Sequence, residues 1–191
     1  HHARTRTVAG RALADEPPMQ RVLADIALDA AAATALVLRV AAAYDQAFES
    51  DGEFALARLL TPVAKFFTAK VAPHAAAEAA EAVGGNALVA PHPLARALAD
   101  APSLQLWAGT GNELALETAR LVTRNPRLLE DTLDVLAADL GGNGPARREE
   151  IERVADLAGR DPAAARLLAE RLALFAAAAA MRRDLPRVVS D

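Results

Sequence analysis

Residues 15–44 read DEPPMQRVLADIALDAAAATALVLRVAAAY, and the spacing of their apolar side chains predicts one long helix. The acidic pair and the two prolines at the start are typical of a helix N-terminus, where negative charge is favourable and no intrahelical N–H is needed. Apolar residues then recur at steps of three and four from Met19 to Tyr44. The helix is expected to end before Ser50-Asp51-Gly52, which breaks the pattern.

The rest of the chain shows further helical patterns. A second long helix is predicted over about residues 53–83, with a kink or restart at Pro62 capped by Thr61 and an end at Gly84-Gly85-Asn86. Residues 86–112 are irregular apart from a short helix over 94–98. Further helices are expected over residues 113–123, 126–140, 147–158 and 162–181.

Two long helices joined by a short turn and followed by more helices predict an all-α protein, an antiparallel four-helix bundle with extra C-terminal helices. Glycine and proline gather in the segment from Gly141 to Pro145. That break predicts a bundle over residues 1–140 and an additional helical extension over 141–191, packed on the bundle.

Composition narrows the classes of function. Of the 191 residues 53% are hydrophobic but only 4% are aromatic, which favours close packing of small side chains between helices. The absence of cysteine excludes disulfides, thiolate metal sites and thiol nucleophiles. The histidines are too scattered to predict a metal site. They are His1, His2, His74 and His92.

The formal net charge of -4 gives no overall attraction to polyanions. This counts against nucleic-acid binding as the sole purpose of the chain. The sequence also has no uninterrupted apolar run of the roughly 18 to 20 residues that span a bilayer. We therefore expect a cytoplasmic protein without a membrane partner.

Several motifs follow one another in order along residues 2–130. They are Arg6-x-x-x-Gly10, Ala64-Lys65, Glu81-x-x-Gly84-Gly85-Asn86, Leu94-x-Arg96, Asp100-Ala101 and the segment from Leu106 to Asn112. In this order they resemble the C-terminal helical domain of the acyl-CoA dehydrogenase family. The segment Thr61–Lys65, taken with Trp107-x-Gly-Thr-Gly-Asn112, resembles the alkylation-response (AidB-like) branch of that family.

The resemblance implies a flavoprotein that acts on the CH–CH bond of an acyl-CoA-like substrate. FAD would be held between domains and across a subunit interface of a dimer or tetramer, with the other domains preceding residue 1. Arg6 would bind the pyrophosphate of a neighbouring subunit's FAD, and the turn with Glu81, Gly84 and Gly85 would approach its adenosine. Thr110 and Asn112 would lie at the flavin side.

The sequence also departs from the family pattern. Ala9 replaces a usual phenylalanine, Glu81 a common glutamine and Ala99 an arginine. Ala108 stands where many members have the carboxylate that removes the substrate α-proton, and alanine cannot be a general base. No catalytic residue is therefore predicted in this chain. Either the base lies on an earlier helix, upstream of residue 1, or dehydrogenation has been lost or changed, which the other departures favour.

Two alternatives from other classes stay open. An alkylation-response protein could bind DNA through arginines of the extension, although interleaved acidic residues make a solvated helix face the simpler interpretation. The candidate DNA contacts are Arg147, Arg148, Arg182 and Arg183. The chain could also be a catalytically inert oligomerisation bundle. Trp107 is expected to fill a packing gap rather than to contact substrate.

Overall fold

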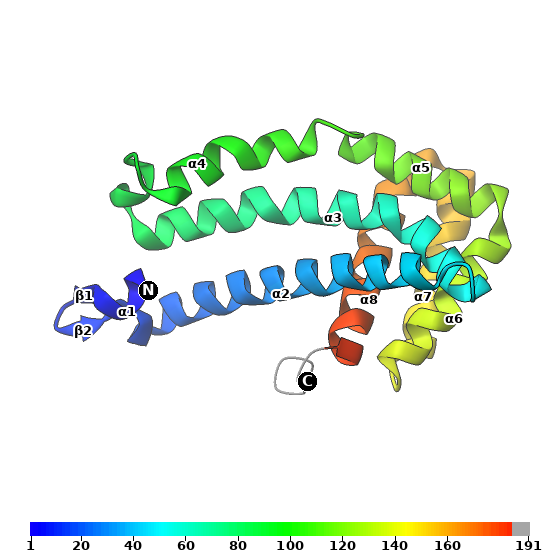
Figure 1. Ribbon diagram of the computed structural model, residues 1–191, viewed down its shortest axis with the longest axis horizontal. Coiled ribbons are helices and arrows are strands. Elements are labelled where there is room, and N and C mark those ends of the chain that lie inside the picture. Colours follow the sequence, from blue (N-terminus) through cyan, green and yellow to red (C-terminus); the bar gives the residue numbers. More distant parts are fainter. Residues whose placement is uncertain (185–191) are drawn as a thin grey trace. The chain divides into compact units, whose positions relative to one another are not determined.

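The computed structural model describes residues 1–184. They divide into two compact units, each of which combines two segments distant in sequence. The first unit comprises His1–Ala31 and Ala69–Trp107, and the second comprises Ala32–Thr68 and the described residues from Ala108 onward. Figure 1 shows the order of their helices along the chain.

The structure is helical apart from one short hairpin. The first elements are α1 (His2–Thr5), β1 (Thr7–Val8), β2 (Arg11–Ala12), η1 (Leu13–Asp15), α2 (Pro17–Gln46) and α3 (Asp51–Val83). They are followed by η2 (Gly85–Leu88), α4 (Pro93–Asp100), η3 (Ala101–Gln105), α5 (Gly111–Arg124) and α6 (Pro126–Leu140). The last are α7 (Gly144–Arg160), η4 (Pro162–Ala164) and α8 (Ala165–Asp184). The all-α class is thus confirmed.

The second long helix spans the predicted stretch, and of the two outcomes expected at Pro62, a kink or a restart, the restart does not occur. Helix α3 continues from Asp51 to Val83 without a restart, and Pro62 is buried within it. The Thr61 hydroxyl donates a hydrogen bond to the Ala57 carbonyl at 2.7 Å, so Thr61 lies inside the helix and does not cap a new one. Buried packing at Leu59, Leu60 and Val63 on this stretch outweighs the hydrogen bond that proline removes.

Helix α2 is 30 residues long, and by length and composition alone it could cross a membrane. Soluble proteins have core helices that pass the same test. From the sequence no membrane-spanning segment is expected, because that expectation requires an uninterrupted apolar run. Charged residues interrupt the apolar residues of α2, although its average hydropathy is high.

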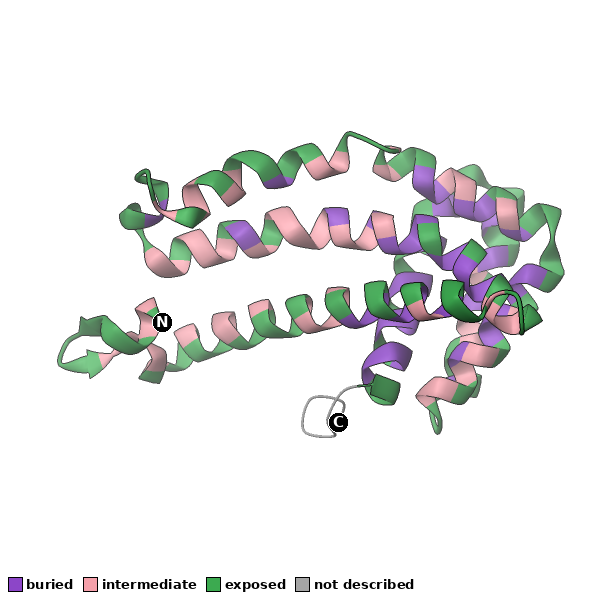
Figure 2. Cartoon of the chain, in the orientation of Figure 1, coloured by how far each residue is buried: buried purple, intermediate pink, exposed green. Residues whose placement is uncertain are grey.

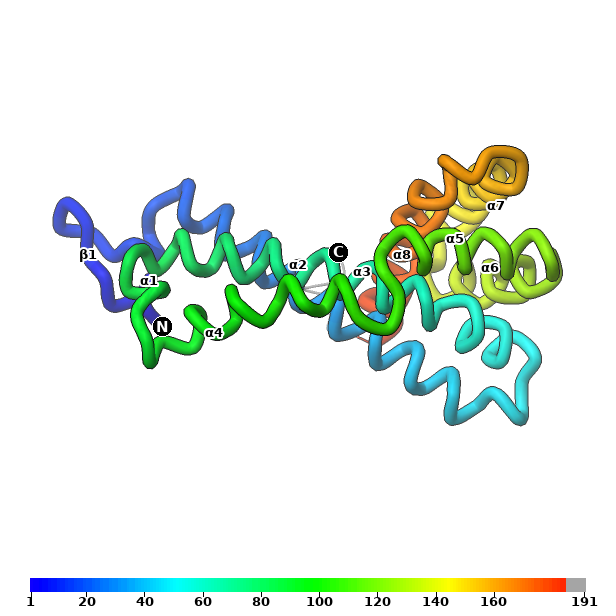
Figure 3. The backbone as a smooth tube through the Cα atoms, turned by 90° about the horizontal axis from the view of Figure 1, so that it is seen from above, coloured from blue at the N-terminus to red at the C-terminus, as the bar shows by residue number. Residues whose placement is uncertain are grey.

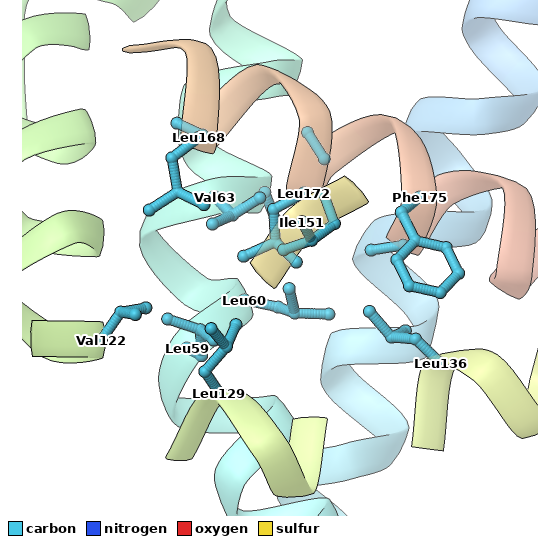
Figure 4. Packing of buried hydrophobic residues seen from close by; sticks show 14 of the residues in the cluster. Leu59, Leu60, Val63, Val122, Leu129, Leu136, Ile151, Leu168, Leu172 and Phe175 are labelled. Atoms are coloured by element: carbon cyan, nitrogen blue, oxygen red, sulfur yellow. The ribbon is translucent and has the colours of Figure 1, made fainter. Parts of the chain in front are cut away.

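The second unit has a core of large aliphatic side chains. Helices α5, α6, α7 and α8 contact one another, and Figure 3 shows them grouped together. Figure 4 shows their side chains meeting those of α3 around Leu60. Alanine is frequent in α8, and Ala173, Ala176 and Ala180 are fully buried there. Each fully buried leucine contributes about 1.5–3 kcal/mol, so this core stabilises the second unit.

A buried arginine is the centre of a charge network that joins four helices in the second unit. Arg39 on α2 is 1% exposed and donates to Glu53 on α3 at 2.7 and 2.9 Å and to Asp139 on α6 at 3.1 Å. Arg183 on α8 lies 3.6 Å from Asp139. Burial alone would lower the pKa of Arg39, but its hydrogen bonds and charge interactions with Glu53 and Asp139 outweigh burial and raise the pKa.

The first unit has no comparable core. Among its described residues only four alanines are buried: Ala69, Ala76, Ala87 and Ala101. Figure 2 shows the described chain coloured by burial. Local hydrogen bonds order its segments: the His92 ring accepts from the Leu94 N–H at 3.2 Å and so caps α4. Lys70 donates to the Gln105 side chain at 2.7 Å.

The extension packs within the second unit, because α7 and α8 contact both α5 and α6. The two units therefore do not coincide with a division between residues 140 and 141. That division into a bundle over 1–140 and an extension over 141–191 stays a prediction, and residues 185–191 lie outside the described part of the chain.

Candidate functional site

Arg6 precedes the hairpin of the first unit. Strands β1 and β2 pair antiparallel with Thr7 opposite Ala12 and Val8 opposite Arg11, and the Arg6 carbonyl accepts the Leu13 N–H at 2.8 Å. The two turn residues Ala9 and Gly10 have φ of 50° and 85°, the pattern of a tight turn that matches strand twist.

The Arg6 side chain is exposed, and within residues 1–184 its guanidinium has no ion-pair partner. Its charge is therefore available to an anion. Arg11, on the other arm of the hairpin, is instead paired with Glu16 at 3.6 Å.

The turn after α3 exposes its backbone. The Gly84 N–H donates to the Ala80 carbonyl at 2.8 Å, and Gly84 has φ of 77°, a conformation that favours glycine. A Cβ added to Gly84 or Gly85 would meet no atom within 4 Å, so the space beside both residues is open. The Glu81 side chain is exposed in the last turn of α3. The turn can accept a close ligand, and Glu81 brings a negative charge to it.

A cavity of about 320 Å³ lies in the same unit. His1 and His2 of the N-terminal segment, Ala82 and Val83 of α3, and His92 contribute to its lining. The segment before Arg6 and the helix end before Gly84 therefore border one space. Sequence reasoning missed this cavity because its walls lie about 80 residues apart.

The loop before α5 belongs to the second unit. Ala108 and Gly109 have φ of 55° and 97°, and a Cβ added to Gly109 would come within 3.0 Å of a Leu114 methyl group. Thr110 caps α5 in a capping box: its side chain accepts a backbone N–H of Glu113, while the Glu113 carboxylate accepts the Thr110 N–H at 3.0 Å. The polar groups of Thr110 thus have partners in the helix cap.

Asn112 follows in the first turn of α5. Its Oδ1 accepts a hydrogen bond from Nη1 of Arg166 on α8 at 2.9 Å. The Arg166 guanidinium also lies 5.7 Å from the centre of the Phe66 ring and 4.0 Å from the Glu170 carboxylate. No local pattern in the sequence predicts the contact between Asn112 and Arg166, which are 54 residues apart.

The predicted site residues thus fall into two groups. Arg6, Glu81, Gly84 and Gly85 belong to the first unit, whereas Thr110, Asn112 and Ala108 belong to the second. Trp107 is 59% exposed, so it does not fill a packing gap as expected.

These features belong to a known domain. The family model described as acyl-CoA dehydrogenase, C-terminal domain, matches residues 1–122. The chain belongs to the acyl-CoA dehydrogenase family. The match includes every predicted cofactor residue and ends within α5, before the helices α6 to α8.

Two curated relatives agree with this family. The chain is 33% identical over 168 residues to AidB of Escherichia coli (strain K12), which carries a provisional acyl-CoA dehydrogenase name; the alignment covers 84% of this chain and 31% of AidB. It is 28% identical over 123 residues to cyclohexane-1-carbonyl-CoA dehydrogenase of Geobacter metallireducens, covering 64% of this chain and 30% of that enzyme. The chain spans about a third of the length of these relatives.

Solved structures share the fold. The apo form of Bd2924 superposes with a TM-score of 0.85 at 26% identity, covering 95% of this chain and 36% of that one. ACDH-11 of Caenorhabditis elegans, in complex with C11-CoA, has a TM-score of 0.84 at 20% identity, covering 100% of this chain and 36% of that one. Both confirm the helical fold, including the C-terminal helices beyond the family match.

Arg147, Arg148 and Arg183, which are candidate DNA contacts, are engaged with carboxylates. Arg147 lies 2.7 Å from Glu150, and Arg183 lies 3.6 Å from Asp139. Arg148 is bonded to Glu152 at 2.9 Å and to Asp134, and the hydrogen bond with Glu152 is the main cause that raises the pKa of Arg148. No contact in the described residues favours DNA binding, which stays a prediction.

Proposed function

We propose that this chain is the cofactor-side helical domain of an acyl-CoA-dehydrogenase-like FAD flavoprotein. The observation that carries the proposal is the family match over residues 1–122, within which every residue expected to contact the cofactor lies at an exposed position. The acyl-CoA-like substrate class is proposed on the same family basis.

The residues of the first unit fit an anionic nucleotide in two respects. The unpaired Arg6 guanidinium offers a fork of donors to pyrophosphate oxygens. The open backbone at Gly84 and Gly85 allows a ligand to approach closely. Glu81 disfavours binding of an anion, because its carboxylate repels phosphate. We therefore expect Glu81 to lie near the uncharged adenosine of the cofactor.

The residues of the second unit have distinct roles. Thr110 holds the loop through the cap of α5, because its hydroxyl and N–H are already bonded to Glu113. Asn112 keeps its amide NH2 group for a ligand, because only its oxygen is bonded to Arg166. FAD, when bound, would supply the hydride acceptor, and these side chains would orient it.

The proton step is where this chain departs from the usual activity. The methyl group of Ala108 cannot accept the substrate α-proton. Dehydrogenation would then require a base from another part of the protein. We propose that activity is lost or changed, in line with the departures at Ala9, Glu81 and Ala99.

Self-association into a dimer or tetramer belongs to the same proposal. Val37 and Leu38 on α2 are 47% and 62% exposed, and Phe48 in the turn after α2 is 99% exposed. Covering large exposed apolar side chains with a partner removes them from water and stabilises the assembly. A second copy of the protein is the partner that the family basis supports.

The test is FAD binding by the longest protein that the gene encodes. We expect flavin absorption bands that survive gel filtration, or that appear when FAD is added to colourless protein. Arg6→Met should weaken FAD affinity by about tenfold or more, since hydrogen bonds to charged groups contribute about 1.5–3 kcal/mol. Arg4→Met is the matched control, because Arg4 is also exposed and lies two residues away.

Hydrogen exchange sharpens this test. FAD should protect the amides of residues 1–31 and 69–107, where the Arg6 and Gly84 contacts lie. A protein that stays colourless at high FAD concentration, with unchanged exchange, would rule the flavoprotein out. The inert oligomerisation bundle and the DNA-binding protein would then remain as alternatives.

A further inference from the structure

The hydrogen bond between Arg166 and Asn112 fixes the orientation of an amide at the proposed cofactor site. A guanidinium carries only donors, so the group of Asn112 that faces Arg166 at 2.9 Å must be the oxygen. The amide NH2 is thereby left for another partner. Without Arg166 the amide could turn over, and either of its ends could face a ligand.

Arg166 is itself held in place by two further contacts. Its guanidinium lies 5.7 Å from the ring centre of Phe66, which is only 3% exposed and belongs to the hydrophobic core. Such a contact between a cation and an aromatic ring is attractive. Glu170, one helical turn further along α8, lies 4.0 Å away. The side chain therefore has a defined position before any ligand binds.

Arg166 lies outside the part of the chain that matches the family model. The family match ends at residue 122, whereas Arg166 lies in α8, among the additional C-terminal helices. One of these helices thus reaches back to the first turn of α5, which begins directly after the loop with Ala108 and Thr110.

We infer that Arg166 is a positioning residue that orients the Asn112 amide so that its NH2 group is presented to an acceptor atom of the flavin cofactor. This inference rests on the proposed function. It assigns the C-terminal helices a part in the cofactor site, in addition to their packing in the second unit.

The test is a double-mutant cycle of FAD affinity, measured by flavin fluorescence on apoprotein made from the longest gene product. The variants are Asn112→Ala, Arg166→Met and the two combined. Each single change should weaken FAD binding by about five- to tenfold, the range of one hydrogen bond. Because Arg166 acts through Asn112, the double variant should bind FAD no more weakly than Asn112→Ala alone.

Two further variants separate orientation from charge and from general damage. Arg166→Lys keeps a donor for the Asn112 oxygen and should recover part of the lost affinity. Arg171→Met changes another exposed arginine of α8, which lies 3.7 Å from Glu150, and should leave FAD affinity unchanged. The thermal midpoint of each apoprotein is recorded in parallel, because a purely structural role would lower it without a matching loss of affinity.

The outcomes are distinct. An Arg166→Met protein that binds FAD like the wild type, or losses that add in the double variant, would overturn the positioning role and leave the proposed function intact. A wild-type protein that binds no FAD would overturn both, which the wild-type titration alone reveals.

Discussion

Helix α2 illustrates how differently the two units are built. Leu36, in the second unit, is fully buried, whereas Leu28, eight residues earlier in the first unit, is 52% exposed. Of the predicted apolar stripe, Ile26 in the first unit is likewise only partly buried, whereas Val40 in the second unit is buried. An apolar face in the sequence therefore shows that something should cover the helix, but not what covers it.

The consequence differs between the units. The second unit buries leucines, isoleucine and phenylalanine and so supplies its own stabilisation. The first unit buries only small alanines among its described residues, and it also carries Arg6, Glu81, Gly84 and Gly85. A segment with little core gains stability from whatever binds it. We therefore expect the proposed FAD site and the stability of the first unit to depend on each other.

The largest expected effect comes from the buried charge of the second unit. Arg39→Met leaves Glu53 and Asp139, which are 13% and 16% exposed, without their main partner. Breaking a buried pair of this kind should lower the free energy of unfolding by about 3–5 kcal/mol. Unfolding in urea measures this free energy.

The matched control lies on the same helix in the first unit. Arg21 is paired with Asp25 at 2.8 Å, but its side chain is 80% exposed. Arg21→Met should change the unfolding free energy by less than about 1 kcal/mol, because exposed pairs contribute little. Equal losses from the two variants would show that the buried network is not formed in solution.

The next effect concerns leucines. Leu133 on α6 is fully buried, so Leu133→Ala removes apolar contacts and leaves a cavity, at a cost of about 2–4 kcal/mol. Leu28→Ala, at a half-exposed position of the first unit, should cost less than about 1 kcal/mol. A large loss from Leu28→Ala would contradict this expectation and mean that Leu28 is covered in solution. Repeating the unfolding at several protein concentrations would show whether a second copy of the protein covers it.

Much of the fold could be predicted from the sequence. Helix bounds depend on local signals such as prolines at the starts of α6 and α7 and glycine at the end of α3, and these act without knowledge of the tertiary structure. The exceptions are positions decided by packing. The helix does not restart at Pro62 with Thr61 as its cap, and Trp107, expected to fill a packing gap, is exposed.

The candidate site could be predicted only in part. Its residues could be predicted because the family motifs that contain them are local in sequence. The contact between Asn112 and Arg166 and the cavity beside α1 and α3 join segments far apart in the chain. No local pattern encodes which helix faces return to the same place.

The smallest expected effect concerns two alanines with left-handed backbone, one in each unit. Ala9 and Ala108 have φ of 50° and 55°, a conformation that costs a residue with a Cβ about 1–2 kcal/mol but is open to glycine. Ala9→Gly and Ala108→Gly should each raise the free energy of unfolding by about 0.5–1 kcal/mol, because relief of this strain exceeds the entropy lost on fixing glycine. Ala41→Gly, at an exposed position inside α2, should instead lower it by about 1 kcal/mol.

If Ala108→Gly lowers the stability as Ala41→Gly does, the loop at the family's catalytic position has an ordinary backbone conformation in solution. If only Ala9→Gly fails to stabilise, the hairpin of the first unit is not formed in the protein without its ligand, and adding FAD should then restore the gain.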